Sequence, residues 1–365
     1  MSLRPQRGLD SIKPYVPGKP IGEVERELGI HDVIKLASNE NPLGVSPKAL
    51  AAMRGALDAA NMYPDGASYD LRTAIAQRFD FSLDDVAVGN GADDLILELS
   101  MAYLDDGDEV IASRSSFPIY DIYTSAMRAK MVKVALGPGY RLDLEAMARA
   151  INERTRIIYV CNPNNPTGTI VTASELARFL KKAPDRALVV LDEAYAEMVD
   201  SPEFPDGLGY VREGRRNVLV LRTFSKVYGL AGIRLGYGFA HRETLAPLFR
   251  VKPAFTVNSV AQAAGIAALG DVEFVRFTVS ENRKGREFLY GEFRRLGLEF
   301  AESHTNFVLV RIGPEAAVVQ QRLLREGVIV RPCGAYDLPE CLRVSIGTPP
   351  QNERFVVALE NVLRR

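Results

Sequence analysis

The chain has 365 residues, of which 47% are hydrophobic and 25% charged, as in an ordinary soluble globular protein. Forty-five lysines and arginines stand against 46 aspartates and glutamates, which leaves a formal charge of −1. This balance excludes a broad nucleic-acid-binding or anionic-membrane surface, because both need a basic excess. No run approaches about 20 uncharged apolar residues, and the first residues lack the apolar core of a secretion signal. We therefore expect a cytoplasmic protein without a membrane span.

The cysteines and histidines are few. Three of each are scattered along the chain, which predicts neither a disulfide framework nor a metal site. Cys333 and Cys341 are expected to be small buried residues, as free cysteines usually are. Any chemistry in this protein is therefore expected to rest on side chains other than histidine.

Short apolar, β-branched runs alternate with helical patterns between about residues 85 and 250. Strands are predicted at 85–88, 109–112, 131–136, 156–161, 187–191, 217–221 and 235–240, and helices at 92–103, 116–128, 144–150 and 173–182. This alternation predicts right-handed crossover connections and a mostly parallel sheet. The runs at 157–160 and 188–191 are apolar on both faces, as a sheet covered by helices on both sides requires.

Two flanking regions differ from this pattern. Residues 251–365 predict a smaller α+β lobe, with helices at 260–296, 315–326 and from Asn352 onward, and strands at 307–310, 327–331 and 342–346. The first 40 residues contain no clear element before 23–28 and are interpreted as an arm that packs on the small domain or on a partner subunit. We thus expect an arm (1–40), a large domain (41–250) and a small domain (251–365) that form one catalytic unit.

An amide, a carboxylate and an amine stand at the ends of three successive predicted strands. Asn165 lies in the turn after the strand at 156–161, Asp192 follows the next strand, and Lys226 follows the one after that. Arg234 comes eight residues after Lys226. Because ligands of open parallel sheets bind outside the carboxyl ends of the strands, these side chains are expected to share one site.

Such a set of groups suits pyridoxal phosphate. A lysine amine can form an imine with the aldehyde, and a carboxylate beside the ring nitrogen keeps that nitrogen protonated. Hydroxyls, an arginine and a helix N-terminus can hold the phosphate, and the small residues at 88–94 supply such a terminus. Taken singly, Lys226 would be a solvated residue and Asp192 a helix cap. Their joint order along the chain favours the cofactor.

Three segments resemble the fold-type I aminotransferases: Asn-Pro-x-Asn-Pro-Thr-Gly at 162–168, Asp-Glu-Ala-Tyr at 192–195, and Ser-Lys-x-x-Gly-Leu-x-Gly-x-Arg-x-Gly-Tyr at 225–237. Segments 14–18 and 35–44 narrow the resemblance to the histidinol-phosphate aminotransferase family, and the similarity runs nearly end to end, through 342–347. The resemblance implies an α/β fold-type I transferase. Its large domain would have a mostly parallel sheet covered by helices, joined by a smaller α+β C-terminal domain and an N-terminal arm.

The same resemblance implies roles for individual residues. The catalytic residues would be Lys226, which bonds to the cofactor and moves the proton, Asp192 at the ring nitrogen, and Tyr195, which holds the ring oxygen together with Asn165. Cofactor phosphate would be held by the backbone of Ala92 and Asp93, by Thr223, Ser225 and Arg234, and by Tyr63 of the partner in a homodimer. Tyr120, rather than Phe117, would stack on the ring. Substrate would meet Tyr15, Asn41, Arg331 and Arg343.

The strand at 342–346 supports a substrate role for Arg343 independently. Its sequence alternates, so Arg343 and Ser345 share the face opposite the apolar residues. A guanidinium fork binds a carboxylate or a phosphate in bidentate fashion, which makes Arg343 a candidate anion clamp. Arg331 is a second candidate, and the following Pro332 leaves its orientation open.

The implied reaction is reversible amino transfer in histidine biosynthesis. Glutamate would leave its nitrogen on the cofactor and depart as 2-oxoglutarate, and imidazole-acetol phosphate would take that nitrogen to become L-histidinol phosphate, with Lys226 as general base and acid. Two alternatives on the same scaffold stay open, an aromatic amino-acid (phenylalanine or tyrosine) aminotransferase and a decarboxylase of a phosphorylated amino acid. A non-enzymatic binding module would not need Lys226, Asp192 and Arg234. A nicotinamide-dependent oxidoreductase would need a glycine fingerprint that is missing.

Overall fold

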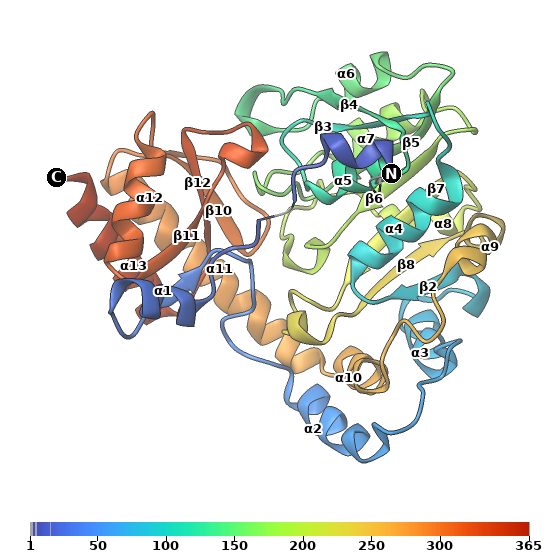
Figure 1. The fold of residues 1–365 in the computed structure, drawn as a ribbon, viewed down its shortest axis with the longest axis horizontal. Coiled ribbons are helices and arrows are strands. Elements are labelled where there is room, and N and C mark those ends of the chain that lie inside the picture. The colour runs from blue at the N-terminus through green and yellow to red at the C-terminus, as the bar shows by residue number, and fades with distance from the viewer. Residues whose placement is uncertain (1–2, 4–5, 15, 365) are drawn as a thin grey trace.

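The computed structural model describes residues 3, 6–14 and 16–364. Two lobes are joined by the long helix α11 (Val272–Arg295), and the N-terminal chain runs from the large lobe across to the small one (Figure 1). None of the helices in these ranges is both long enough and apolar enough to cross a membrane.

The large lobe is built on a seven-stranded sheet. Its strands are β2 (Val86–Gly89), β3 (Glu109–Ser113), β4 (Lys130–Val134), β5 (Thr155–Cys161), β6 (Leu188–Asp192), β7 (Val218–Thr223) and β8 (Gly236–Ala240). They lie in the order β2-β8-β7-β6-β5-β3-β4; β8 pairs antiparallel with both β2 and β7, and all the other pairs are parallel. Each strand begins and ends within about two residues of its predicted range, which confirms the α/β fold with a mostly parallel sheet.

Helices cover both faces of this sheet. One face carries α4 (Ala92–Tyr103), α5 (Ile119–Ala126) and α9 (Arg242–Val251). The other face carries α3 (Tyr69–Phe79), α6 (Leu144–Arg149), α7 (Ala173–Leu180), α8 (Gly207–Arg212) and α10 (Ser259–Leu269), with α2 (Pro47–Ala56) packed beside α10. Alternate strand residues enter the two cores: Ile158 and Val160 belong to one, Ile157 and Tyr159 to the other. The two-sided apolar pattern of the strands is thereby explained.

The small lobe contains a second sheet, of order β1-β11-β12-β10-β9. Its strands are β1 (Ile34–Leu36), β9 (Glu299–Phe300), β10 (Phe307–Arg311), β11 (Val328–Pro332) and β12 (Cys341–Ser345), and it packs against α11, α12 (Ala316–Arg325) and α13 (Pro349–Leu363).

Short 3-10 helices occur in both lobes, at Arg7–Ser11, Leu57–Ala59, Leu83–Asp85, Pro138–Tyr140, Ala196–Met198, Ala231–Ile233 and Gly334–Tyr336. Cys161, Cys333 and Cys341 are free and buried, as expected for Cys333 and Cys341.

The predicted single helix at 260–296 is wrong. The chain forms α10, which ends at Leu269, and α11, which begins at Val272. The break is held by Asp271, whose carboxylate accepts hydrogen bonds from the Ser46 hydroxyl at 2.6 Å and from the Lys48 amide at 3.4 Å. Since α10 packs into the core of the large sheet, we propose that the large domain extends beyond residue 250 to include it.

The N-terminal segment belongs to both lobes. Helix α1 (Ile21–Leu28) and β1 add to the small lobe, because β1 pairs in parallel with β11 and Val24 packs against Leu324. The 3-10 helix at Arg7–Ser11 instead contacts α5 of the large lobe. This segment therefore bridges the lobes of its own chain, and the strand β1 leads directly to the residues discussed below.

Candidate active site

A cavity of about 290 Å³ lies at the carboxyl ends of β5, β6 and β7, where the small lobe faces the large sheet. Ten of the predicted site residues line it: Ala92, Asp93, Asn165, Asp192, Tyr195, Thr223, Ser225, Lys226, Arg234 and Arg343. Residues from distant parts of the chain thus meet at the edge of the sheet where the strand pattern places a ligand.

Asp192 ends strand β6 at the floor of the cavity and is 5% exposed. Its Oδ2 accepts a hydrogen bond from the Tyr120 hydroxyl at 2.5 Å, and its Oδ1 accepts one from the Ala194 amide at 3.2 Å. Burial raises the pKa of the Asp192 carboxyl, while these two hydrogen bonds act in the opposite direction. A cationic partner facing the cavity would satisfy this carboxylate.

Lys226 enters the cavity from the loop after β7. Its Nζ donates to the backbone oxygen of Asn39 at 3.3 Å and lies 5.6 Å from the centre of the Tyr195 ring. Burial, and then the positive charge of Arg343, lowers the pKa of the Lys226 amine to about 8. With this pKa about a tenth of the amine is uncharged at pH 7, far more than for a solvated lysine, and the uncharged amine is the form that attacks a carbonyl carbon.

Tyr195 and Asn165 lie on the wall nearest the small lobe. The Tyr195 oxygen accepts a hydrogen bond from Nδ2 of Asn39 at 3.0 Å, and Oδ1 of Asn165 accepts one from Nη1 of Arg343 at 2.5 Å. Both side chains come from segments that follow central strands, and both are more than 90% buried. They form a polar wall that links the large sheet to strand β12.

The opposite end of the cavity is a cradle at the start of α4. This helix has no side-chain cap, so its first amides are available to an anion. The Thr223 hydroxyl donates to the Ser225 hydroxyl at 3.0 Å beside it. Gly91 has φ 88° and lies so close to Arg234 that a Cβ would stand 2.4 Å from Nη2. Without a side chain at this position, the arginine reaches the end of the helix.

Arg343 and Arg331 lie directly opposite each other on the antiparallel strands β12 and β11 and therefore share one face of the sheet. Leu342 and Val344 point into the small-lobe core, as the sequence alternation predicts. Arg343 is 4% exposed and donates to the Ala37 oxygen at 2.7 Å. Its Nε has no hydrogen-bond partner among the described residues. Arg331 and Arg343 both lie 6.0 Å from the centre of the Tyr336 ring, although only Arg343 lines the cavity.

Of the two aromatic candidates for stacking on the cofactor ring, Phe117 lines the cavity and Tyr120 does not. Tyr120 is 1% exposed, packs in parallel with Tyr159 at 4.1 Å between ring centres, and contacts the floor of the site through Asp192. Both aromatic residues lie at the start of α5, three positions apart, and their sequence pattern does not distinguish them. We therefore propose Phe117 as the stacking residue, in place of the predicted Tyr120.

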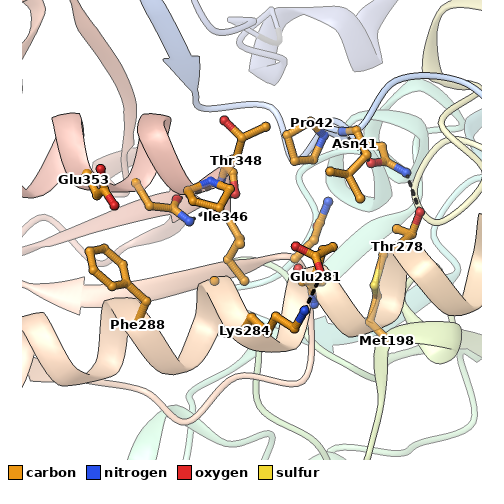
Figure 2. Close-up of a pocket in the computed structure, with 17 residues that line it drawn as sticks. Asn41, Pro42, Met198, Thr278, Glu281, Lys284, Phe288, Ile346, Thr348 and Glu353 are labelled. Atoms are coloured by element: carbon orange, nitrogen blue, oxygen red, sulfur yellow. Dashed lines mark hydrogen bonds and ion pairs between the residues drawn. The ribbon is translucent and has the colours of Figure 1, made fainter.

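Two further predicted residues, Tyr63 and Asn41, do not line this cavity. Tyr63 is 82% exposed and stacks on Phe255 at 4.7 Å between ring centres. Asn41 donates to the Val227 oxygen at 3.0 Å and lines a separate cavity of about 230 Å³ between the N-terminal chain, α11 and α13 (Figure 2). Tyr15 lies outside the described residues.

Among the residues that line the cavity without having been predicted, Asn39 and Tyr336 bring polar side chains to it from outside the large-lobe strands. Asn39 precedes the predicted Asn41 by two positions in the same motif, and only the structure indicates which of the two faces Lys226. Tyr336 reaches the cavity from a short 3-10 helix of the small lobe. No pattern in the sequence around Tyr336 indicates this position.

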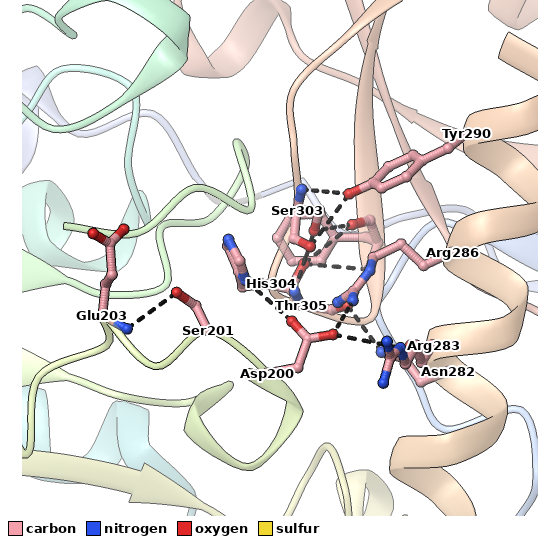
Figure 3. A network of polar contacts seen from close by, with 11 residues as sticks. Asp200, Ser201, Glu203, Asn282, Arg283, Arg286, Tyr290, Ser303, His304 and Thr305 are labelled. Carbon is pink, nitrogen blue, oxygen red and sulfur yellow. Dashed lines mark hydrogen bonds and ion pairs between the residues drawn. The ribbon is translucent and has the colours of Figure 1, made fainter. Parts of the chain in front are cut away.

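A polar network joins the lobes beside the cavity (Figure 3). Asp200, in the loop after the 3-10 helix Ala196–Met198, accepts a hydrogen bond from Nη2 of Arg286 on α11 at 2.6 Å. The backbone amide of His304 donates to the Gly168 oxygen at 2.8 Å, so the turn that carries Asn165 rests against the small lobe. This network fixes the position of the two lobes relative to each other.

The residues present fit pyridoxal phosphate. The cradle at α4 offers amides, hydroxyls and a guanidinium to a phosphate, and Asp192 offers a carboxylate to a protonated ring nitrogen. Lys226 stands between these two ends with a lowered pKa. Gly91 is needed for the cradle, because any Cβ there would displace the arginine.

The sequence pattern of the family Aminotransferase class I and II matches residues 31–359. The chain belongs to this family and is an enzyme of the aminotransferase class. Curated relatives at nearly full length are histidinol-phosphate aminotransferases. The one from Moorella thermoacetica is 48% identical, covering 97% of this chain and 91% of the relative, and histidinol-phosphate aminotransferase 2 of Carboxydothermus hydrogenoformans is 46% identical, covering 98% and 99%.

Solved structures agree with this assignment. Histidinol-phosphate aminotransferase from Sinorhizobium meliloti, in complex with pyridoxal-5'-phosphate, superposes with a TM-score of 0.92 at 28% identity, covering 100% of this chain and 98% of that one. Aspartate aminotransferase from Thermus thermophilus with maleate gives a TM-score of 0.85 at 25% identity over the whole of both chains. The predicted fold class is confirmed by both.

Proposed function

We propose that this aminotransferase interconverts L-histidinol phosphate and 2-oxoglutarate with imidazole-acetol phosphate and L-glutamate, using pyridoxal phosphate. The observation that carries the proposal is the convergence of Lys226, Asp192 and Arg343 on one cavity between the lobes. Full-length relatives named for the same activity support the choice of substrate.

The cofactor would be held at three points. Its phosphate would lie at the cradle made by the start of α4, Thr223, Ser225 and Arg234, its ring nitrogen against Asp192, and its ring oxygen against Tyr195 and Asn165. When bound, pyridoxal phosphate supplies an electron sink for the negative charge that develops on the substrate carbon. The carboxylate of Asp192 would keep the ring nitrogen protonated and so sustain that property.

Lys226 would move the proton. Its Nζ is the only lysine amine lining the cavity within the described residues, and its lowered pKa lets the same atom accept and then return a proton near neutral pH. The backbone oxygen of Asn39 accepts from this Nζ and would hold it beside the reacting carbon.

Arg343 would bind both substrates in turn. The glutamate half-reaction presents a carboxylate and the other half-reaction a phosphate, and a guanidinium group accommodates either anion. Its buried Nε has no partner among the described residues and is available for such an anion. Arg331, directly opposite on the neighbouring strand, would add positive charge to the same face.

The active form would be a homodimer in which Tyr63 reaches the cofactor phosphate of the partner subunit. Support comes from the exposed stack of Tyr63 on Phe255, which is unusual for two aromatic rings unless a partner covers them. The next residue, Thr256, donates to Asp94 at 2.8 Å, so the stack lies close to the start of α4.

The test compares kcat/KM for histidinol phosphate and for phenylalanine, each with 2-oxoglutarate as acceptor. We expect a clear preference for histidinol phosphate; a large preference for phenylalanine would indicate the aromatic aminotransferase instead. Release of carbon dioxide without 2-oxoglutarate would indicate a decarboxylase.

The purified protein should carry a near-visible absorbance band that borohydride removes and that Lys226→Ala lacks. A colourless protein that cannot be reconstituted with pyridoxal phosphate contradicts the proposal altogether.

A further inference from the structure

We propose that Asn39 is a positioning residue for the amino-transfer reaction: its side chain aims the Tyr195 hydroxyl at the ring oxygen of the cofactor, and its backbone oxygen holds the Lys226 amine. This inference rests on the proposed function and extends it to a residue that no motif role covers. Asn39 itself would make no covalent bond and transfer no proton.

Strand pairing places Asn39 in the cavity. Strand β1 ends at Leu36 and pairs in parallel with β11, so the next residues pass along the small-lobe sheet toward Lys226. Arg343 donates to the Ala37 oxygen at 2.7 Å and thereby fixes this segment on β12. Asn39 is 1% exposed and has φ 55°, a left-handed conformation that asparagine tolerates better than most residues.

The orientation of the Asn39 side chain follows from Ser345. The Ser345 hydroxyl accepts a hydrogen bond from the backbone N–H of Asn39 at 2.9 Å and donates one to the side-chain Oδ1 of Asn39, also at 2.9 Å. Nδ2 is therefore turned the other way and donates to the Tyr195 oxygen at 3.0 Å. Because Tyr195 accepts this hydrogen bond, its own proton is free to be donated into the cavity. The ring oxygen of the cofactor would be the acceptor.

The backbone oxygen of Asn39 contacts the reacting group itself. It accepts from Nζ of Lys226 at 3.3 Å and from Nδ2 of Asn306 at 3.0 Å. Ser345 and Asn306 both belong to the small lobe, and Tyr195 and Lys226 to the large one. Asn39 is thus held by the small lobe and in turn orients Tyr195 and Lys226, the two large-lobe groups that would contact the cofactor.

The decisive variant is Asn39→Gly. Glycine adopts φ 55° readily, so the substitution removes the side chain without straining the backbone. Pyridoxal phosphate is bound to wild type and variant, and the pH midpoint of the visible band is measured. Without Asn39 to aim it, the Tyr195 hydroxyl would donate less well to the ring oxygen of the cofactor. That oxygen would then carry more negative charge, so the proton that it shares with the Lys226 nitrogen would be lost only at higher pH. We expect the midpoint to rise by about half a unit or more, with kcat reduced about tenfold and the KM for glutamate changed much less.

Three further variants make the result specific. Tyr195→Phe removes the donor itself and should shift the midpoint in the same direction and further. Ser345→Ala removes the hydrogen bond that orients the side-chain amide of Asn39, so this amide can rotate, and the pH midpoint should shift in the same direction but by less. Asp80→Gly replaces an exposed residue with φ 57° at the end of α3, so it reports only the effect of placing glycine at a left-handed position. It should leave the midpoint and kcat as in wild type.

An unchanged midpoint in Asn39→Gly, while Tyr195→Phe shifts it, would overturn the role of Asn39. If Asn39→Gly does not fold, Ser345→Ala decides: an unshifted midpoint and unchanged kcat in that variant refute the inference. Failure of the proposed function looks different, because the wild type would then show neither the visible band nor amino transfer.

Discussion

The Tyr120 hydroxyl donates a 2.5 Å hydrogen bond to Oδ2 of Asp192 from below the cavity. Burial raises the pKa of Asp192 and this hydrogen bond lowers it, so Tyr120 helps to keep the carboxylate ionised for the ring nitrogen. In Tyr120→Phe we expect about tenfold weaker binding of pyridoxal phosphate and a kcat about tenfold lower, which corresponds to one hydrogen bond to a charged group. Equilibrium titration of the cofactor and steady-state kinetics measure both.

Tyr159→Phe is the matched control for this prediction. The Tyr159 ring stacks on Tyr120, but its buried hydroxyl has no hydrogen-bond partner among the described residues. Its removal should leave cofactor affinity unchanged and stability equal or slightly higher. Equal effects of the two substitutions would mean that ring packing, and not the hydrogen bond, supports Asp192.

Lys226 gives a prediction for pH dependence. Burial and Arg343 lower the pKa of its amine to about 8, well below that of a solvated lysine. The rate at which the cofactor-free enzyme bonds to pyridoxal phosphate should rise with pH and level off above about 8, because only the uncharged amine reacts. Stopped-flow absorbance measures this rate. A rate that still rises tenfold per unit at pH 9 would refute the lowered pKa.

Gly91 and Gly107 form a matched pair for testing the phosphate cradle. Both have positive φ, 88° and 87°, but a Cβ on Gly91 would stand 2.4 Å from Nη2 of Arg234, whereas nothing lies within 4 Å of one on Gly107. Alanine at either position carries the same backbone strain, about 1–2 kcal/mol. Only Gly91→Ala should also weaken cofactor binding, by at least tenfold. Comparable cofactor affinity in the two variants would argue against a role of Arg234 in the cradle.

Strand positions could be predicted from the sequence because the central strands are apolar on both faces and are separated by helices. Strand β1 could not be predicted, since it is three residues long and acquires its partner, β11, from the far end of the chain. The break between α10 and α11 depends likewise on a distant contact, between Asp271 and Ser46. Local patterns carry no information about such pairs.

The residues of the candidate site also differ in whether local sequence or a contact with a distant segment sets their position. Residues that end a strand or follow it directly, such as Asp192 and Lys226, were predictable because the sheet itself brings them together. Phe117 and Tyr120 were not distinguishable, because the packing of α5 against the sheet decides which ring faces the cavity. Asn39 was missed because its place depends on the small lobe, through Ser345.

Arg343 is predicted to serve both half-reactions. In Arg343→Ala we expect kcat/KM to fall about a hundredfold for glutamate and for histidinol phosphate alike, since a charge-assisted bidentate contact contributes about 3 kcal/mol. Arg311→Ala changes an exposed arginine on the neighbouring strand β10 and should leave both values unaltered. A loss for only one of the two substrates would show that a second residue binds the other anion.

The pair of Asp200 and Arg286 predicts how the lobes are held together. Arg286 is 4% exposed and Asp200 about one-third exposed, so Asp200→Asn leaves a buried guanidinium without its counter-charge. We expect the free energy of unfolding to fall by about 2 kcal/mol at pH 7, against less than about 1 kcal/mol for Asp206→Asn, whose partner Arg212 is exposed.

The stabilisation by this pair should depend on pH. Although burial of Asp200 opposes the effect, Arg286 lowers the pKa of the Asp200 carboxyl. The stabilisation is therefore present above the usual pKa of an aspartate and is lost as pH falls through the lowered value. The free energies of unfolding of wild type and Asp200→Asn, measured with denaturant, should therefore begin to converge below about pH 4 and become equal once pH is below the lowered pKa of Asp200; a difference that does not shrink as pH falls would refute a charge effect.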